Sequence, residues 1–416
     1  MKVLVLGADG FIGRHIAFAL RDQGVEVLAH ARAPARLAAM GFATLAADLT
    51  DSATHEPGFW APHLTDCHVI NAAGLLTGSK AQFRAVHQLV PAALMAARPV
   101  GCRILHISAV EIDRAETGFA RWRRETERVF QDQIILRPGL VLAETSYGGS
   151  SLLRALAALP FVTPVVGDGR QAFNPIHAAD LAQAAHEALA AGLTGTWEIG
   201  GPETLDQRAL VATLRGWMGL APARLLRLPY GFARAVGRLG DALRLGPISA
   251  TAVAQLEAGV LADAGPLLQR LTFRPRPVTG FIAARPAGTQ DLWQARLYLL
   301  KPLIRLTLAA LWLASAGLGL CTPVAEFLPA VAALPESLAT LLARAGGLAD
   351  AALGLALLAN WRPRGTALAQ LALVLAYTLG LTLIAPGLWL DPFGGLLKNL
   401  PVLALILTHL ALIEER

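Results

Sequence analysis

The sequence predicts a doubly wound α/β domain with a parallel sheet, followed by a small mixed α/β domain and a bundle of four transmembrane helices. Three observations predict this fold class. The first half of the chain alternates short apolar runs with helical patterns, which is typical of parallel α/β sheets. A glycine-rich turn at residues 7–13 directly follows the first apolar run. Long apolar stretches then fill much of residues 299–413.

Short apolar runs in the first half are expected to be strands that are buried on both faces of the sheet. These runs are Lys2–Leu6, Val25–Ala29, Thr44–Ala46, His68–Asn71, Arg103–Ile107, Ile134–Leu136 and Thr196–Ile199. Helical patterns follow at Phe11–Gln23, Gln82–Ala96, Arg121–Phe130 and Ala179–Ala190. This alternation predicts a sheet that is covered by helices.

After residue 201 the pattern changes to helical pieces separated by turns that contain proline and glycine, which indicates a new domain and a linker. We therefore expect an α/β domain at 1–200, to which residues 140–178 add part of a substrate lobe. A small substrate-type domain with its linker is expected at 201–291, and a membrane domain at 296–416. Within the small domain, Tyr230–Leu243 is an amphipathic segment, interpreted as a core-facing helix with an anionic membrane surface as the alternative.

Four apolar stretches are each close to the ~20 residues needed to cross the hydrocarbon layer of a bilayer. They are Leu299–Leu320, Leu338–Ala359, Thr366–Ile384 and Gly395–Ile413. Basic residues flank the first stretch and fill the loop between the second and third, whereas acidic residues mark the other two loops. This bias predicts that both termini and the α/β domain are cytoplasmic, in a bacterial inner membrane. Arg305 and Lys398 are expected to extend to the membrane surface from the span ends.

Composition excludes several classes of protein. Of the 416 residues, 54% are hydrophobic and only 16% are charged, which is too apolar for a wholly soluble protein, and the mean hydropathy is +0.49. The net charge of +6 comes from scattered basic residues without interleaved aromatic residues, so no nucleic-acid partner is predicted. The three cysteines form no CxxC motif, and no cluster of side chains has metal-ligand spacing, so no metal is predicted.

The glycine-rich turn predicts a dinucleotide site. Gly7, Gly10 and Gly13 lie between an apolar strand and a helix, where backbone approaches a pyrophosphate and the helix N-terminus supplies N–H groups. At the end of the second strand, where an NAD site has an acidic residue, this chain has Arg32 and, further on, Arg36. Arginine suits a 2′-phosphate. We therefore predict NADP(H) rather than NAD(H) as the cofactor.

Further motifs extend this pattern along the chain: Asp48-Leu49, Asn71-Ala-Ala-Gly74, His106-Ile-Ser108, Leu136-Arg-Pro-Gly139 and Pro175-Ile-His-Ala-Ala-Asp180. With the glycine turn, they resemble the short-chain dehydrogenase/reductase family, in its extended and atypical branches, over about residues 1–290. The resemblance implies a Rossmann domain of the NAD-dependent epimerase/dehydratase kind. It also implies a set of cofactor-binding positions: Gly7, Asp9, Gly10, Phe11, Ile12, Gly13, Arg32, Arg36, Asp48, Leu49, Ala72, Ala73, Gly74, Arg123, Pro138 and Gly139.

The catalytic pair of that family is replaced here. The family uses a tyrosine and, four residues on, a lysine on one helix face, together with a serine after the fifth strand. This chain has Ser108, but Phe119 and Arg123 stand at the tyrosine and lysine positions. Phenylalanine cannot exchange a proton. Arginine can still hydrogen-bond to ribose hydroxyls.

Three side chains are weighed as substitutes for the missing tyrosine. Tyr147 follows the sixth strand and is a candidate proton donor, with a structural loop tyrosine as the alternative. His177 belongs to a motif that orders the domain interface in the resembling family, and Glu144 is interpreted as a surface loop acid. A quinone-type acceptor that takes its protons from water would need no replacement.

The last quarter of the chain resembles the DoxX-like four-helix membrane domain, at Leu388-Trp-Leu-Asp-Pro-Phe393 and Lys398-Asn-Leu-Pro401. Asp350 lies near the middle of the second span, on a face with Gly346 and Gly354. An acid at this depth is a candidate functional residue, with a hydrogen-bonded structural aspartate as the alternative.

Two functions follow from these patterns. The first is a membrane-anchored NADP(H)-binding oxidoreductase for a lipophilic small molecule, quinone- or isoprenoid-like. The alternative is a catalytically degenerate NADP(H) sensor or an assembly protein of a membrane respiratory or quinone-synthesis complex. Both have the lipid bilayer as a partner.

Overall fold

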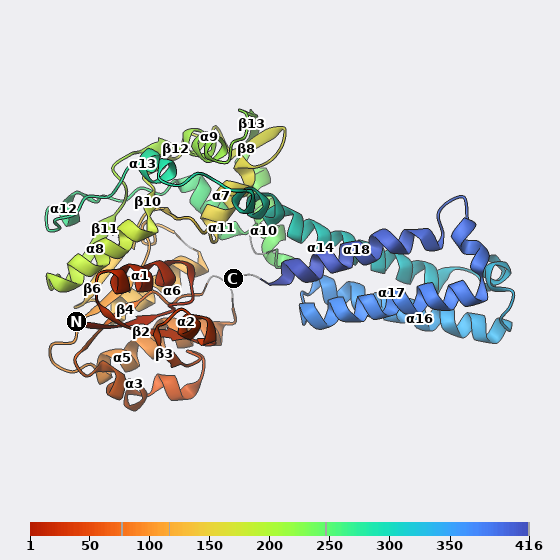
Figure 1. The fold of residues 1–416 in the computed structure, drawn as a ribbon, viewed down its shortest axis with the longest axis horizontal. Coiled ribbons are helices and arrows are strands. Elements are labelled where there is room, and N and C mark those ends of the chain that lie inside the picture. The colour runs from red at the N-terminus through yellow and green to blue at the C-terminus, as the bar shows by residue number, and fades with distance from the viewer. Residues whose placement is uncertain (76–77, 116, 246–247, 415–416) are drawn as a thin grey trace. The chain divides into compact units, whose positions relative to one another are not determined.

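The computed structural model describes residues 1–75, 78–115, 117–245 and 248–414. The chain forms two compact units (Figure 1). The first contains Met1–Gly237 and Pro247–Ala295, and the second contains Arg238–Gly246 and Arg296–Arg416. Each unit is considered by itself below.

A seven-stranded parallel sheet organises the first unit. Its strands are β1 (Lys2–Leu6), β2 (Glu26–Ala31), β3 (Ala43–Ala46), β4 (Cys67–Asn71), β5 (Ile104–Ile107), β6 (Ile134–Pro138) and β11 (Gly195–Ile199). Each corresponds to one of the runs expected to be strands, so this part of the prediction is confirmed. The spatial order is β11-β6-β5-β4-β1-β2-β3. The order therefore reverses between β1 and β4, which is where an open α/β sheet binds its ligand.

Successive side chains along a strand point alternately into two apolar cores, one on each face of the sheet. Val3 and Val5 of β1 face one core, which contains Ile16 of helix α1, whereas Leu4 and Leu6 face the other. The period of two along a strand explains this division. Helices α1 (Phe11–Asp22) and α8 (Ala178–Ala190) cover the first face, and α3 (Pro57–Leu64) and α5 (Val90–Ala97) cover the second (Figure 1).

Shorter elements complete the first unit. Its remaining helices include α2 (Ala35–Ala39), α4 (Lys80–Arg84), α6 (Gly118–Val129), α7 (Gly149–Ala157), α9 (Gln207–Trp217), α11 (Ala250–Ala258), α12 (Gly265–Leu268) and α13 (Val278–Ala283), with a π-helical turn at Ala85–Leu89. Small strand pairs are β7 (Val141–Leu142) with β10 (Ile176–His177), β9 (Ala172–Phe173) with β12 (Leu205–Asp206), and β8 (Val162–Val166) with β13 (Arg224–Leu228). The strand pairs form a lobe beside the sheet together with α7, α9, α11 and α13.

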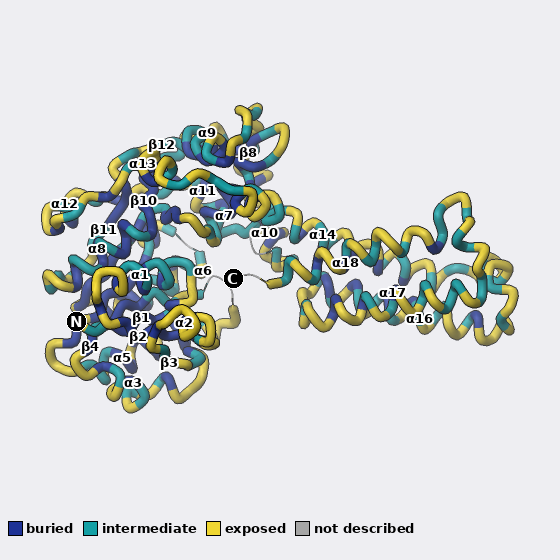
Figure 2. The backbone as a smooth tube through the Cα atoms, in the orientation of Figure 1, coloured by how far each residue is buried: buried dark blue, intermediate teal, exposed yellow. Residues whose placement is uncertain are grey.

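Among the described residues, four helices are long and apolar enough to cross a membrane: Thr289–Cys321 (α14), Glu336–Leu358 (α16), Pro363–Ile384 (α17) and Leu396–Ile413, which includes α18 (Asn399–Ile413). The prediction of four spans is confirmed, although α14 begins at Thr289 instead of Leu299. The short helix α15 (Val324–Phe327) lies between the first two. Small or apolar side chains fill the space between the helices, among them Leu308, Ala367 and Ile406, while exposed residues recur along each helix (Figure 2).

Two arginines of the second unit bind backbone carbonyls. Arg305, expected to extend to the membrane surface, is instead only 6% exposed and donates to the carbonyls of Leu243 and Arg244, with 3.2 Å to the latter. Protein carbonyls therefore surround the Arg305 guanidinium. Arg344 donates to Gly319 O at 2.8 Å and Thr322 O at 2.9 Å, where α14 ends. Both arginines thus donate to carbonyls at the C-terminal end of a helix or just beyond it, where no intrahelical donor follows.

Candidate functional site

The glycine turn is compact because its three glycines leave no room for side chains. Gly7 has a φ of +70°, and a Cβ there would lie 3.0 Å from the Cα of Ala73. A Cβ on Gly13 would lie 2.1 Å from the Gly7 carbonyl oxygen. No side chain caps α1 at Gly10, so the first N–H groups of the helix are available to a ligand. The turn lies at the point where the strand order reverses.

Basic side chains gather beyond the turn, at the end of β2. Arg32 and Arg36 are exposed there. Burial lowers the pKa of Arg14, and the nearby Arg36 lowers it further, so these two cations lie close together. Sequence reasoning missed Arg14, whose only signal is its place directly after the third glycine. Asp9, exposed in the turn itself, is an acidic neighbour of Arg14.

His30 of β2 is buried next to the glycine turn and is neutral at pH 7. The Gly7 N–H points at its Nδ1, 3.4 Å away. Burial lowers the pKa of His30 to about 4. At neutral pH the positive charge at the end of β2 therefore comes from the arginines alone.

Asp48 and Leu49 lie at the end of β3. Asp48 Oδ1 accepts the N–H of Thr50 at 2.9 Å and its hydroxyl at 2.8 Å, and these bonds lower the pKa of Asp48. Leu49 is buried. A cleft of about 530 Å³ opens beside Thr50 and is lined also by His55 and by Lys80 and other residues of α4. The cleft is roomy enough for a flat aromatic ring.

At the end of β4, the backbone of Ala72 and Ala73 packs against Gly7 of the glycine turn. The Ala72 N–H donates to the carbonyl of Leu6 at 3.2 Å, and the Ala73 N–H donates to Asn71 Oδ1, also at 3.2 Å. The turn and the β4 end thus form one surface.

The structure brings Ser108, Phe119 and Arg123 to the end of β5. Arg123 Nη1 donates to the carbonyl of Ile107 at 2.7 Å, and its guanidinium carbon lies 5.2 Å from the centre of the Phe119 ring. A Cβ on Gly74 would lie 2.5 Å from Arg123 Nη2, so the guanidinium rests against the Gly74 backbone. Arg123, which shares a face of α6 with Phe119, therefore lies between the ends of β4 and β5.

Several polar atoms at this point are buried and have no hydrogen-bond partner among the described residues: Ser108 Oγ, His106 Nε2 and Arg123 Nε. Burial lowers the pKa of Arg123 to about 10, so it stays charged at neutral pH. No described carboxylate forms an ion pair with it. Because buried polar groups are normally paired, these atoms fit a site for a polar ligand, and ribose hydroxyls would suit them.

Pro138 and Gly139 end β6 next to this point. The Gly139 N–H donates to Ile199 O at 2.9 Å, and the Val110 N–H donates to Pro138 O at 3.3 Å. A Cβ on Gly139 would lie 3.2 Å from Asn174 Oδ1, so a side chain would displace that amide. The two residues thus join β6 to the neighbouring loops.

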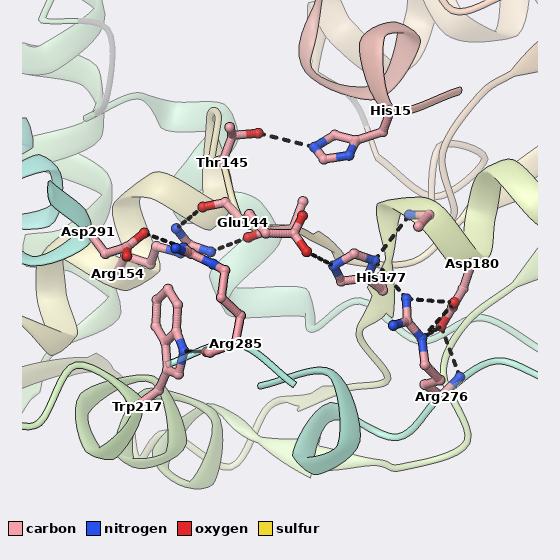
Figure 3. Close-up of polar contacts among 12 residues, drawn as sticks. His15, Glu144, Thr145, Arg154, His177, Asp180, Trp217, Arg276, Arg285 and Asp291 are labelled. Carbon is pink, nitrogen blue, oxygen red and sulfur yellow. Dashed lines mark hydrogen bonds and ion pairs between the residues drawn. The ribbon is translucent and has the colours of Figure 1, made fainter. Parts of the chain in front are cut away.

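Glu144 and His177 form a pair in the lobe beside the sheet (Figure 3). His177 Nε2 lies 3.2 Å from Glu144 Oε1, and this hydrogen bond lowers the pKa of Glu144 to about 2. His177 Nδ1 accepts the Ala179 N–H at 3.1 Å and lies 3.0 Å from Arg276 Nη2. Two donors at Nδ1 place the proton of the neutral ring on Nε2. His177 therefore orients Glu144, and its nitrogens are both engaged by protein groups.

Next to Glu144 an indole contacts two arginines (Figure 3). Trp217 lies 4.8 Å from the guanidinium carbon of Arg154 and 5.6 Å from that of Arg285. Arg154 donates to the Glu144 carbonyl at 3.0 Å, and Arg285 donates to Asp291 at 2.6 Å. A cavity of about 20 Å³ lies among these side chains, which is room for one water molecule. The cluster fixes the backbone that leads to Tyr147.

Tyr147 lies in the loop between β7 and α7, and 56% of it is exposed. Ser150, at the start of α7, accepts the Tyr147 N–H at 3.1 Å. His15 of α1 contacts the same loop, with Nε2 3.1 Å from Thr145 Oγ1 (Figure 3). The structure thus places Tyr147 on a surface next to the glycine-turn helix, whereas Ser108 is buried.

Asp350 is buried between helices of the second unit. Its oxygens accept the hydroxyls of Ser315 at 2.5 Å and Tyr377 at 2.8 Å. A Cβ on Gly346 would lie 2.9 Å from the Tyr377 hydroxyl, and one on Gly354 would lie 2.7 Å from Leu313. The small residues on this face of α16 therefore let α14 and α17 approach the carboxylate.

Side chains that suit a metal do not gather anywhere in the described ranges: no group of three or more His, Cys, Asp and Glu lies close enough there.

Comparisons with known proteins match the two ends of the chain separately. A model of the NAD dependent epimerase/dehydratase family matches residues 3–114, and a model of the DoxX-like family matches residues 309–407. The search of curated proteins gave no match.

Solved structures resemble the first part of the chain. A short-chain dehydrogenase/reductase superfamily protein from Agrobacterium tumefaciens, solved with NAD, is 16% identical, with a TM-score of 0.50 over 72% of this chain and 99% of that one. A human epimerase family protein, solved with NADPH, is 18% identical, with a TM-score of 0.49 over 71% and 99%. At these identities the first comparison supports the fold alone. The predicted α/β fold class is confirmed.

Proposed function

On the premise that the chain joins a domain of the epimerase and short-chain dehydrogenase/reductase kind to a DoxX-like domain, we propose a function for it. It is a membrane-anchored oxidoreductase that binds NADP(H) in preference to NAD(H) and acts on a lipophilic, quinone- or isoprenoid-like substrate. One observation carries this proposal: an uncapped helix behind a three-glycine turn belongs to the same chain as four apolar helices.

The preference for NADP(H) rests on charge. Arg14, Arg32 and Arg36 surround the end of β2, and a 2′-phosphate there would relieve the repulsion between Arg14 and Arg36. Neutral His30 below the turn adds no charge. We assign Asp48, beyond them, to the adenine side of the nucleotide.

The chemistry needs a hydride, which bound NADPH supplies, and a proton for the substrate oxygen. Ser108 Oγ has no hydrogen-bond partner among the described residues, and we assign Arg123, next to it at the end of β5, to the ribose hydroxyls. Phe119 has no proton to give. We assign the proton to the exposed Tyr147 phenol, because both nitrogens of His177 are engaged and Glu144 stays ionised at neutral pH.

The proposed location is a bacterial inner membrane, with the nucleotide-binding unit on the cytoplasmic side. Arg362 lies between α16 and α17 and Arg364 lies in the first turn of α17, whereas Glu326 lies between α14 and α16 and Glu336 is the first residue of α16. Basic residues concentrate in cytoplasmic loops. This placement gives the cofactor site access to cytoplasmic NADPH.

A second candidate function is a catalytically degenerate NADP(H) sensor, or an assembly protein for a membrane respiratory or quinone-synthesis complex. The contact of Arg123 with Phe119 favours it, because this pair fills the family's catalytic positions without a titratable hydroxyl. Such a protein needs the cofactor site but no proton donor.

Turnover separates the two candidates. The full chain in lipid nanodiscs is mixed with NADPH and short-chain quinones or isoprenoid aldehydes, and loss of the reduced nucleotide is followed by absorbance. The oxidoreductase proposal expects turnover that falls at least tenfold in Tyr147→Phe and is unchanged in the control Tyr230→Phe, another exposed tyrosine. No turnover by the wild type, nor by a Phe119→Tyr/Arg123→Lys variant that still binds NADPH, would favour the sensor.

A further inference from the structure

Helix α10 (Tyr230–Ala242) leaves the large apolar side chains of Phe232 and Leu239 exposed. Phe232, Val236 and Leu239 are spaced by four and three residues, so they share one face. Phe232 is 57% exposed and Leu239 is 56% exposed. The interpretation of this segment as a core-facing helix is therefore wrong for Phe232 and Leu239, whereas Val236 is partly buried.

The packed face of α10 consists of small residues. Ala233, Gly237 and Gly240 are buried. A Cβ on Gly237 would lie 3.0 Å from the Cα of Ala250, so the helix approaches that backbone closely. The large side chains are thus left for another environment, and exposed apolar faces of this kind mark binding surfaces.

The C-terminal turn of α10 belongs to the compact unit that contains the four apolar helices. Arg305 of α14 donates to Leu243 O and Arg244 O, and Arg244 Nη1 donates to Ala359 O at 3.1 Å, where α16 ends. Since Arg305 lies on the first span and Ala359 follows the second, these bonds hold the end of α10 at one end of the four apolar helices.

That end of the group carries residues typical of a membrane–water boundary. Trp361 is 59% exposed, and the guanidinium carbon of Arg362 lies 5.1 Å from its ring. Arg364, two residues on, is also exposed. Exposed tryptophan with arginine is enriched at the depth of lipid headgroups. The bonds to Arg244 and Arg305 place the α10 terminus at this level.

We propose that α10 is an interfacial helix that lies in the headgroup region of the bilayer. Phe232, Val236 and Leu239 then reach the acyl boundary, and the exposed Arg238 binds anionic lipid phosphate. A lipid surface is the occupant that the bonds at the α10 terminus indicate, because the helices holding that terminus are membrane spans. The proposal does not depend on which nucleotide or substrate the chain binds.

Fluorescent labels on α10 test this proposal in the full chain. Cys321 is exposed and is replaced by serine, while the buried Cys67 and Cys102 stay. Bimane is attached to Phe232→Cys or Leu239→Cys, and the protein is placed in nanodiscs that contain phosphatidylglycerol. The matched control is Asp241→Cys, which is nine residues from position 232 and so on the opposite side of the same helix.

Spin-labelled lipids are expected to quench the labels at 232 and 239 at least threefold more than the label at 241, and aqueous iodide is expected to show the reverse order. Replacing phosphatidylglycerol by phosphatidylcholine should weaken the lipid quenching, and Arg238→Gln should have the same effect. Should Phe232→Cys fail to purify, Val236→Cys reports on the same face. Equal iodide quenching at all positions would overturn the proposal. Shielding of 232 and 239 from both quenchers would also overturn it, because a protein would then cover the face.

Discussion

Arg123 lies over Phe119, with its guanidinium carbon 5.2 Å from the ring centre, and donates to the Ile107 carbonyl at 2.7 Å. These residues occupy the positions of a tyrosine–lysine pair in the family that the first domain resembles. Arg123 keeps a positive charge beside Gly74, and Phe119 lacks the phenol of the family's tyrosine. The proposed function therefore assigns cofactor contact and proton transfer, which one pair combines in that family, to separate residues of this chain.

Replacing Arg123 tests its assignment to the cofactor. Arg123→Met removes a buried charge that no described carboxylate pairs, so the free energy of unfolding without nucleotide should change by less than about 1 kcal/mol. The affinity for NADPH should fall about tenfold or more, because a charge-assisted hydrogen bond contributes roughly 1.5–3 kcal/mol. Thermal unfolding with and without NADPH measures both. The control is Arg121→Met, at an exposed position of the same helix. Unchanged affinity together with a large loss of stability would make Arg123 structural.

The glycine turn offers a steric test. Gly13→Ala places a Cβ 2.1 Å from the Gly7 carbonyl, so the turn must open. We expect loss of NADPH binding and a destabilisation of about 1–3 kcal/mol. Gly216→Ala, in α9 with no atom within 4 Å of its Cβ, should instead stabilise the protein by roughly 0.5–1 kcal/mol. Calorimetry and nucleotide titration of both variants measure these effects. Normal NADPH affinity in Gly13→Ala would contradict a pyrophosphate site at this turn.

The pair of Glu144 and His177 predicts a pH dependence. The pKa of Glu144 is about 2 in the folded chain, against an ordinary 4.5. Its stabilising contribution is thus complete above pH about 4.5 and is lost as the pH falls through about 2. Because Glu144 is 47% exposed, solvent screening keeps this contribution below roughly 1 kcal/mol. Glu144→Gln should flatten the dependence of the melting temperature on pH between 5 and 3, whereas the control Glu26→Gln should not. An unchanged slope in Glu144→Gln would contradict the pairing.

Asp350 is expected to couple with Tyr377. Asp350→Asn leaves one hydroxyl donor without a good acceptor, which costs about 1–3 kcal/mol in a buried position. Tyr377→Phe removes that donor, so the double variant should lose less stability than the sum of the single variants. Thermal unfolding of the full chain in detergent measures this coupling. Turnover of the same variants separates the two interpretations of Asp350: a loss of turnover greater than the loss of folded protein would indicate a functional acid.

The sheet could be located from sequence because its strands are buried on both faces and therefore appear as short apolar runs. Helix α3 was missed because Pro57 opens it and Pro62 lies inside it, a pattern that also indicates a loop. Helix α7 was missed because Gly148 precedes it and Gly149 is its first residue. The tight turn between β1 and α1, in contrast, could be predicted from the spacing of its three glycines.

Contacts between distant segments could not be predicted in the same way. Glu144 reaches His177 because β7 pairs with β10, with Leu142 opposite His177. Two-residue strands leave no recognisable pattern in a sequence. The carbonyl partners of Arg305, on Leu243 and Arg244, could not be predicted because they lie about sixty residues earlier in the chain. Both cases depend on pairing that local sequence does not encode.

The most direct test of the central claim is a titration of the full chain with NADPH and with NADH, followed by the fluorescence of the reduced nucleotide. We expect NADPH to bind at least tenfold more tightly, and Arg32→Ser with Arg36→Ser to remove that preference while leaving NADH affinity unchanged. Arg128→Ser, at an exposed arginine elsewhere on the unit, should change neither affinity. Equal affinity for the two nucleotides in the wild type would contradict the NADP(H) assignment, and binding of neither would contradict a working cofactor site.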